Sequence, residues 1–338
     1  EVDSDLRLMQ DLLHSAERPL IISGGMIEQH YSRSEIVSML VDLASILGGL
    51  YLPLVDGANS AGAWLAGAVP HRGPGGESLE KPGGNVRDLI EKPRKLYFLL
   101  GFDPELDCAR SRDLKMALDS ADFVVALSAF QSEVLDDVAD VILPIAVYAE
   151  NEGTLVNGFG SRQYFEPAIK PVGEARSAWK ILRKLGGDLE LPGFDAVNCR
   201  EVIGLLEPKN SKATKETIKV AGSQLQNKSD KGLLEVLVEV PAYAVDQLVR
   251  HAESLQEMPQ SGDDNVRLNE IVAANLHLSE GDRVGLEMGD VRAISHIKID
   301  NKVARNTCVL AAGHKAVADV ARNGALVRLL SMQGETSS

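Results

Sequence analysis

The chain has 338 residues, a formal net charge of −14 and only 4% aromatic residues. A surface this acidic repels the phosphates of nucleic acid and the head groups of anionic lipid, and few aromatic side chains are available to stack on bases. No run of about 18 apolar residues occurs, so the sequence predicts neither a membrane-spanning helix nor direct insertion into a bilayer. The length suggests about two domains.

Apolar runs of strand-like length alternate with helical patterns through the first 190 residues. Near-continuous apolar strands separated by helices favour a parallel sheet that is buried on both faces. Residues 1–190 are therefore expected to form an α/β domain with a Rossmann-like parallel sheet layer and helices on both faces. The predicted strands are residues 19–23, 50–55, 95–100, 122–127 and 138–143, with an amphipathic helix over 36–47.

A glycine-rich insert and a helix start interrupt this alternation. The insert covers residues 56–94 and favours either a surface loop or a place where another chain or a cofactor approaches the backbone closely. Asp103 followed by Pro104 is typical of an N-cap and a first helical position, so we expect a helix to begin there.

The last part of the chain has a different composition. Residues 191–232 are expected to be a connection, because residues 209–231 are rich in Lys, Ser, Asn, Gln and Thr; an exposed helix or a local basic contact are the alternatives there. A smaller β-rich module is expected over 233–330, followed by a tail at 331–338. Its predicted elements are strands at 233–240, 293–299 and 307–311, and a helix at 270–276 that follows residues 266–269 and ends before residues 281–287.

Cysteine and histidine patterns predict no metal or cluster site. Cys108, Cys199 and Cys308 are far apart and odd in number, without a C-x-x-C pair, so we expect three reduced thiols. The seven histidines form no H-E-x-x-H motif, and the G-x-G-x-x-G, P-loop and G-x-S-x-G patterns are missing from the sequence. No catalytic residue and no metal ligand are predicted.

A polar segment after the fifth predicted strand is the candidate ligand loop. It contains Glu150, Gly153, Thr154 and Asn157. Ligands of open parallel sheets bind outside the carboxyl ends of the strands, glycine permits a tight turn, and short polar side chains supply hydrogen-bonding groups. An ordinary polar turn has the same composition, so the residues alone leave both interpretations open.

The order of motifs along the chain resembles the molybdopterin oxidoreductase superfamily. The matching residues are Ala139-Asp-Val-Ile-Leu-Pro144, the frame Glu150-x-x-Gly153-Thr154-x-x-Asn157, Gly160, Gln163, Pro171-x-Gly173-Glu174-Ala175-Arg176 and Trp179. Within the superfamily, the glycine-rich stretch 58–76 and the stretch 240–256 look most like the G subunits of bacterial NADH:quinone oxidoreductase, respiratory complex I. The resemblance covers nearly the whole chain.

This resemblance implies both a fold and a role. It implies a Rossmann-like layer followed by a barrel-like module. It also implies electron transfer from NADH towards quinone through iron–sulfur clusters, which an upstream cysteine-rich region would hold. The chain, which begins at Glu1, is then expected to be a C-terminal scaffold without a redox centre. The implied partners are the other peripheral-arm subunits of complex I, and the implied location is the cytoplasmic side of the inner membrane.

One departure from the superfamily pattern concerns the molybdopterin cofactor. The superfamily commonly has Asn-x-Glu-Gly-Arg-x-Gln, whereas this chain has Phe159 at the Glu position and Ser161 at the Arg position. Arg162 is shifted by one residue, which in an extended segment sends its guanidinium to the opposite face. An anionic pterin dinucleotide would lose a bidentate donor, so we expect no molybdopterin here.

The four loop residues are then a vestigial pterin site. Two alternatives to the scaffold role stay open. The chain could be part of an active molybdopterin oxidoreductase that resembles the α subunit of formate dehydrogenase, with the same four residues touching the cofactor. It could also be a free-standing nucleotide-binding domain that uses the carboxyl edge of the sheet, although the phosphate-cradling glycine pattern is missing from the sequence.

Overall fold

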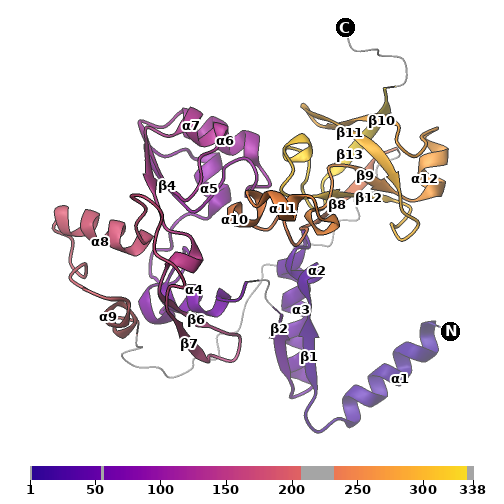
Figure 1. Ribbon diagram of the computed structural model, residues 1–338. Helices are drawn as coiled ribbons and strands as arrows, with labels where there is room; N and C mark the ends of the chain where they lie inside the picture. Colours follow the sequence, from indigo (N-terminus) through magenta and orange to yellow (C-terminus); the bar gives the residue numbers. More distant parts are fainter. Residues whose placement is uncertain (1, 55–56, 207–231, 333–338) are drawn as a thin grey trace. The chain divides into compact units, whose positions relative to one another are not determined.

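The computed structural model describes residues 2–54, 57–206 and 232–332, and it divides into two compact units (Figure 1). The first unit holds the described residues of 2–80, 154–164 and 203–206. The second holds 81–153, 165–202 and 232–332. Two predicted segments lie mostly outside the described residues: 207–231 of the connection predicted at 191–232, and 333–338 of the tail predicted at 331–338.

The first unit contains a parallel β-α-β crossover. Strands β1 and β2 pair in parallel, and α3 lies between them in the chain. Gly49 allows the second strand to begin, because a Cβ at this position would lie 2.3 Å from the carbonyl oxygen of Pro19. The elements are α1 (Val2–Ser15), β1 (Leu20–Ser23), α2 (Gly25–Glu28), α3 (Arg33–Ile46), β2 (Leu50–Pro53), α4 (Ser60–Ala66) and the 3-10 turn η1 (Pro74–Gly76).

A parallel three-stranded sheet in the order β3-β4-β5 forms the first part of the second unit. Side chains from α5, α6 and α7 bury one face of this sheet, and α8 packs on the other through Ala178 and Ile181. The sequence prediction of an α/β layer with helices on both faces is thus confirmed. The elements are α5 (Val86–Glu91), β3 (Leu96–Leu100), α6 (Ser111–Asp119), β4 (Phe123–Ser128), α7 (Glu133–Val138), β5 (Val141–Pro144), η2 (Tyr148–Glu150), α8 (Ala178–Asp188) and α9 (Cys199–Gly204).

Three local predictions differ from the structure. The helix expected at Asp103 begins only at Ser111: the Asp103 carboxylate accepts the N–H groups of Glu105 and Leu106 as an N-cap does, but the chain forms only a turn there. The strand expected over 138–143 begins three residues later, since the helix capped by Ser132 runs on to residue 138. The glycine-rich insert over 56–94 contains α4, η1 and α5 and is therefore only partly loop.

The β-rich module is a closed six-stranded barrel, in the order β10-β11-β9-β12-β8-β13. Parallel pairs join β8 to β12 and β9 to β11, and the other pairs are antiparallel. The predicted barrel-like module is confirmed, and the closing strand β13 is one that the sequence analysis missed. The strands are β8 (Leu234–Glu239), β9 (Val266–Leu268), β10 (Arg283–Met288), β11 (Val291–Ile299), β12 (Thr307–Ala311) and β13 (Leu326–Ser331).

Short helices fill the connections between the barrel strands. They are α10 (Gln247–Arg250), α11 (Glu253–Gln256), η3 (Pro259–Ser261), α12 (Glu270–Asn275) and η4 (Lys315–Val317). The barrel interior is apolar, with nine side chains that are completely buried: Val266, Leu268, Val284, Leu286, Cys308, Leu310, Val317, Val320 and Val327. Alternate inward residues from every strand therefore build one continuous core.

Polar contacts hold this barrel to the three-stranded sheet within the second unit. The Ser111 hydroxyl donates to Asp319 at 2.5 Å, and the Lys315 ammonium contacts Glu133 at 3.0 Å. Arg322 donates to the carbonyl oxygen of Ala109 at 3.2 Å. These contacts place the loop after β12 against the helices that follow β3 and β4.

Raising the pH above about 9 is expected to destabilise the barrel through Cys308. Burial of this thiol on β12 raises its pKa from 9.0 to about 12. Above the ordinary pKa the unfolded chain releases the proton while the folded chain keeps it. The free energy of unfolding should then fall by about 1.4 kcal/mol per pH unit, up to the folded pKa. Denaturant titrations between about pH 8 and pH 11 would measure this slope.

The Cys308→Ala variant is the control for that slope. It removes the titrating group, so its free energy of unfolding should fall less steeply with pH than that of the parent chain. Parallel slopes for the two proteins would mean that the thiol contributes nothing to the alkaline transition.

Candidate functional site

Glu150, the first predicted site residue, has a buried carboxylate at the end of the turn η2. Its Oε2 atom accepts a hydrogen bond from the backbone N–H of Val147 at 3.0 Å, and Oε1 accepts one from Val172 at 3.2 Å. The adjacent Asn151 donates to the carbonyl oxygens of Ala146 and Val147. Glu150 therefore ties the loop after β5 to the segment that precedes α8.

The Glu150→Ala variant is expected to lose about 2–4 kcal/mol of unfolding free energy, because it leaves two backbone N–H groups without an acceptor. Glu150→Gln keeps one acceptor oxygen and should lose about half as much. Chemical denaturation of the three proteins would measure the difference. An alanine variant as stable as the parent chain would contradict a structural role for the carboxylate.

Two other predicted residues shape the hairpin of β6 (Gly153–Val156) and β7 (Arg162–Phe165). A Cβ on Gly153 would lie 2.9 Å from the ring of Phe165, so this strand position requires glycine or a displaced ring. Asn157 begins the hairpin turn, and its Oδ1 atom accepts the N–H groups of Phe159 at 3.0 Å and Ser161 at 2.9 Å.

The four predicted residues fall on both sides of the unit boundary. Glu150 and Gly153 belong to the second unit, whereas Thr154 and Asn157 belong to the first. The side-chain oxygens of Glu150 and Asn157 are occupied by backbone N–H groups. The role of these residues as a vestigial pterin site stays a prediction.

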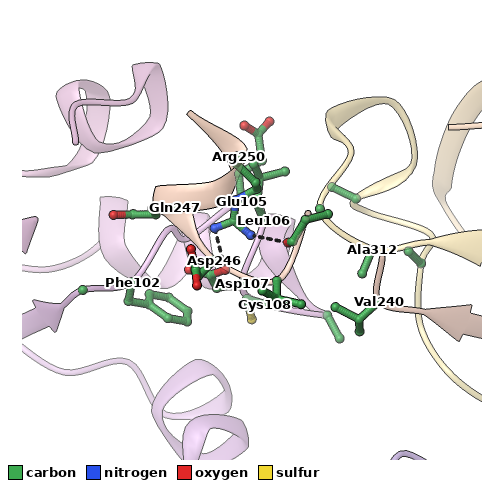
Figure 2. Close-up of a pocket in the computed structure, with 17 residues that line it drawn as sticks. Phe102, Glu105, Leu106, Asp107, Cys108, Val240, Asp246, Gln247, Arg250 and Ala312 are labelled. Atoms are coloured by element: carbon green, nitrogen blue, oxygen red, sulfur yellow. Dashed lines mark hydrogen bonds and ion pairs between the residues drawn. The ribbon is translucent and has the colours of Figure 1, made fainter. Parts of the chain in front are cut away.

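A cavity of about 520 Å³ lies in the second unit at the carboxyl end of β3 (Figure 2). Three segments line it: the loop after β3 (101–109), the connection after β8 (240–250) and the connection after β12 (312–321). The cavity therefore lies between the sheet and the barrel, at the edge where open parallel sheets bind ligands.

A partly buried ion pair crosses one side of this cavity, as the dashed lines in Figure 2 show. The guanidinium of Arg250, which is 7% exposed, donates to Asp107 at 2.7 Å and to the carbonyl oxygen of Ala244 at 3.1 Å. The second oxygen of Asp107 accepts the N–H of Asp103 at 2.8 Å. Both partners of the pair are thus committed to the protein and not directed at a ligand.

Helix α10 also contacts the end of β4. The hydroxyl of Ser128 donates to the Oε1 atom of Gln247 at 3.1 Å, and both side chains are buried. The rings of Phe130 and His251 stack with centroids 4.3 Å apart. The connection after β8 therefore fixes the barrel side of the cavity to the sheet.

The polar lining of the cavity is predominantly acidic. Glu105, Asp107 and Asp246 contribute three carboxylates, whereas Arg250 contributes the single positive charge among the lining residues. Burial raises the pKa of Glu105, and Lys315 at 3.8 Å partly opposes that shift. The excess of negative charge favours a neutral or cationic occupant over an anionic one.

The cavity contains one thiol, that of Cys108. Burial raises its pKa, so this cysteine is held as an unreactive thiol. Among the described residues, no three His, Cys, Asp or Glu side chains lie close enough to bind a metal ion. No helix in the same part of the chain is both long and apolar enough to cross a bilayer.

The fold and site define a class of protein: an α/β chain with parallel sheets and a closed barrel, in which a cavity lies between the three-stranded sheet and the barrel. The acetylene hydratase of Pelobacter acetylenicus has a similar fold, with a TM-score of 0.55 over 81% of this chain and 50% of that enzyme, at 16% identity. The family model described as molybdopterin oxidoreductase matches residues 5–188, more than half of the sequence. The chain belongs to the molybdopterin oxidoreductase family.

Its curated relatives include subunits of NADH-quinone oxidoreductases and of a formate dehydrogenase. The chain is 22% identical to the NADH-quinone oxidoreductase G 2 subunit of Rhizobium meliloti, over 92% of this chain and 41% of the relative. It is 29% identical to the mitochondrial NADH-ubiquinone oxidoreductase 78 kDa subunit of Candida albicans, over 58% of this chain and 25% of that protein. It is also 29% identical to the alpha subunit of the F420-dependent formate dehydrogenase of Methanocaldococcus jannaschii, over 56% of this chain and 32% of the relative. The chain thus spans less than half the length of these relatives.

The cavity does not fit the cofactor that the family name implies. A pterin dinucleotide carries phosphates, which need donors such as free guanidinium or ammonium groups. The lining of this cavity offers three carboxylates and one arginine, which already donates to Asp107 and Ala244.

Proposed function

We propose that this chain is the C-terminal scaffold region of the G subunit of an NADH:quinone oxidoreductase, and that it has no redox centre of its own. The observation that carries the proposal is the extent of the match to the Rhizobium meliloti G 2 subunit, which covers 92% of the chain and so includes the barrel. The match to the formate dehydrogenase alpha subunit covers 56%. The whole subunit would relay electrons from NADH through iron–sulfur clusters held outside this sequence.

The contacts in the second unit support a structural task. The ion pair of Arg250 with Asp107, and the bond from Ser128 to Gln247, tie the barrel to the sheet after β3 and β4. The hydrogen-bond donors that a cofactor would need already bind other groups of the same chain. Such a block can hold a cluster-bearing region and its neighbours in a fixed geometry, which electron transfer between clusters requires.

The proposed partners are the other subunits of the peripheral arm, and the proposed location is the cytoplasmic side of the inner membrane. The acidic composition supports attachment through protein contacts over adsorption to anionic lipid. Washing membranes with salt or mild alkali should release the subunit together with the NADH-oxidising arm.

The alternative is part of an active molybdopterin oxidoreductase, and the 29% identity to a formate dehydrogenase alpha subunit favours it. In that case Glu150, Gly153, Thr154 and Asn157 would contact the cofactor.

Measurement of the activity, metal content and pterin content of the purified full-length protein in its native complex distinguishes the two functions. The scaffold proposal expects NADH:quinone oxidoreductase activity with iron and sulfide, and with neither molybdenum, tungsten nor an extractable pterin. A stoichiometric pterin with molybdenum or tungsten, together with formate oxidation, would replace the proposal with its alternative.

A further inference from the structure

The tip of the β6–β7 hairpin presents an aromatic ring to solvent. Phe159 is 85% exposed, although an aromatic ring of this size gains free energy when it is buried in an apolar environment. The tip is also conformationally fixed: the Asn157 side chain accepts the N–H groups of Phe159 and Ser161, and the N–H of Gly160 bonds to the Asn157 carbonyl oxygen at 2.9 Å. Gly160, at φ +80°, occupies the left-handed region that the turn requires.

A fixed and exposed aromatic ring has the properties of an interface anchor. Aromatic residues and arginine are enriched at the centres of protein interfaces, and a preorganised loop loses little conformational entropy when it binds. The side chain of Asn157 holds the backbone of the tip before any partner arrives.

A single positive charge accompanies the ring. Arg162 is the one charged residue from position 154 to 164, in a chain whose net charge is −14. Its side chain is exposed and forms no ion pair within the described part of the chain. The tip therefore combines an apolar anchor with one unpaired guanidinium, which fits an apolar recess flanked by a carboxylate.

We infer that residues 157–162 dock this chain onto a neighbouring protein subunit, which receives Phe159 in an apolar recess and pairs a carboxylate with Arg162. This inference rests on the proposed function, because it takes the partner from the same assembly. A lipid surface fits less well, since one arginine in a chain of charge −14 gives little attraction to anionic head groups.

Placing a photo-crosslinking residue at position 159 of the full-length protein tests the contact inside the assembled complex. We expect a crosslink to one other subunit of the purified complex, within an apolar segment that contains Asp or Glu. A crosslink to lipid alone, or none to protein, would overturn the inference. Vesicles of anionic phospholipid provide a second arm, because Phe159-dependent flotation with them would assign the tip to a membrane.

Substitutions measure the strength of the contact. Phe159→Ala should weaken association of the chain with the complex by about tenfold to a hundredfold, the range for an interface anchor, without unfolding the chain. Tyr148→Ala is the matched control, because Tyr148 is also an exposed aromatic (73%) and lies outside the hairpin. It should leave association unchanged, and an equal loss in both variants would overturn the inference.

Asn157 provides a test that does not touch the ring. Asn157→Ala removes the acceptor that fixes the tip and should weaken association, whereas Asn157→Asp retains an acceptor and should restore it. Failure of the parent protein to co-purify with the subunits of an NADH:quinone oxidoreductase would refute the proposed function itself. Co-purification that is indifferent to Phe159 and Asn157 would refute the docking role alone.

Discussion

The Leu310→Ala variant is expected to lose about 3–5 kcal/mol of unfolding free energy. Leu310 lies on β12, is 0% exposed and belongs to the apolar core of the barrel. Its strand pairs with both β8 and β9, so the backbone around it is held on two sides and has little freedom to collapse into the space left by the side chain. Truncations of buried leucine cost most where the surroundings relax least.

Leu330→Ala is the matched control for this prediction. Leu330 lies on β13 of the same barrel but is 41% exposed, so the same substitution removes less buried surface and should cost less than about 1 kcal/mol. Urea titration monitored by circular dichroism would compare both variants with the parent chain. Similar losses at the two positions would mean that the barrel interior is not packed as a single core.

The strands of the two parallel sheets were predictable because each follows a local rule. The apolar runs at 19–23, 95–100 and 122–127 are short and bounded by glycine or polar residues, which is the pattern of a buried strand. Their parallel pairing then followed from the helices between them. Sheet partners depend on contacts distant in sequence, however, so two parallel sheets in two units could not be distinguished from one larger sheet.

One error arose where a capping residue begins a turn that does not continue as a helix. The carboxylate of Asp103, before Pro104, accepts the N–H groups of Glu105 and Leu106 as an N-cap does, and Asp107 accepts the N–H of Asp103 in return. A single capped turn uses the same residue types as a capped helix, so the sequence does not distinguish them. Asn269, in contrast, caps α12 through its side-chain oxygen, in agreement with the helix predicted at 270–276.

The cavity was not predicted because its residues are distant in sequence. Asp107 and Arg250 are 143 positions apart, and Ser128 and Gln247 are 119 apart. Arg250 lies in a stretch that resembles the G subunits of complex I, but nothing local indicates that its guanidinium is buried. The candidate loop at 150–157 was predictable because its motif is contiguous in the sequence. The side-chain oxygens of Glu150 and Asn157, at the two ends of the loop, nevertheless accept backbone N–H groups.

Arg250→Ala is expected to lower the free energy of unfolding of the second unit by about 3–4 kcal/mol. The arginine side chain is 7% exposed and that of Asp107 is 23% exposed, so removal of the arginine leaves a partly buried carboxylate without a counter-charge. Breaking such a pair costs more than the pair contributes when intact, because the remaining charge stays desolvated. The loss should lie near the lower end of the usual range, since water reaches part of Asp107.

A double-mutant cycle separates the pair from the rest of the cavity. Asp107→Ala should also destabilise, but the double variant should lose about 2 kcal/mol less than the sum, because neither charge is then left alone. Arg112→Ala is the matched control: Arg112 pairs with Asp290 at 3.0 Å and also joins the helices of the sheet to the barrel, but its side chain is 47% exposed and that of Asp290 is 84% exposed. That variant should cost less than about 1 kcal/mol.

The comparison of Arg250 with Arg112 decides what holds the barrel to the sheet. If only the Arg250 variant is strongly destabilised, the junction depends on a charge that the acidic cavity itself requires, because Asp107 would otherwise lack its counter-charge. An arginine with that task cannot also be released to bind a phosphate without destabilising the fold. Equal, small losses at both positions would instead leave Arg250 free to serve a ligand, and would favour the cofactor-binding alternative.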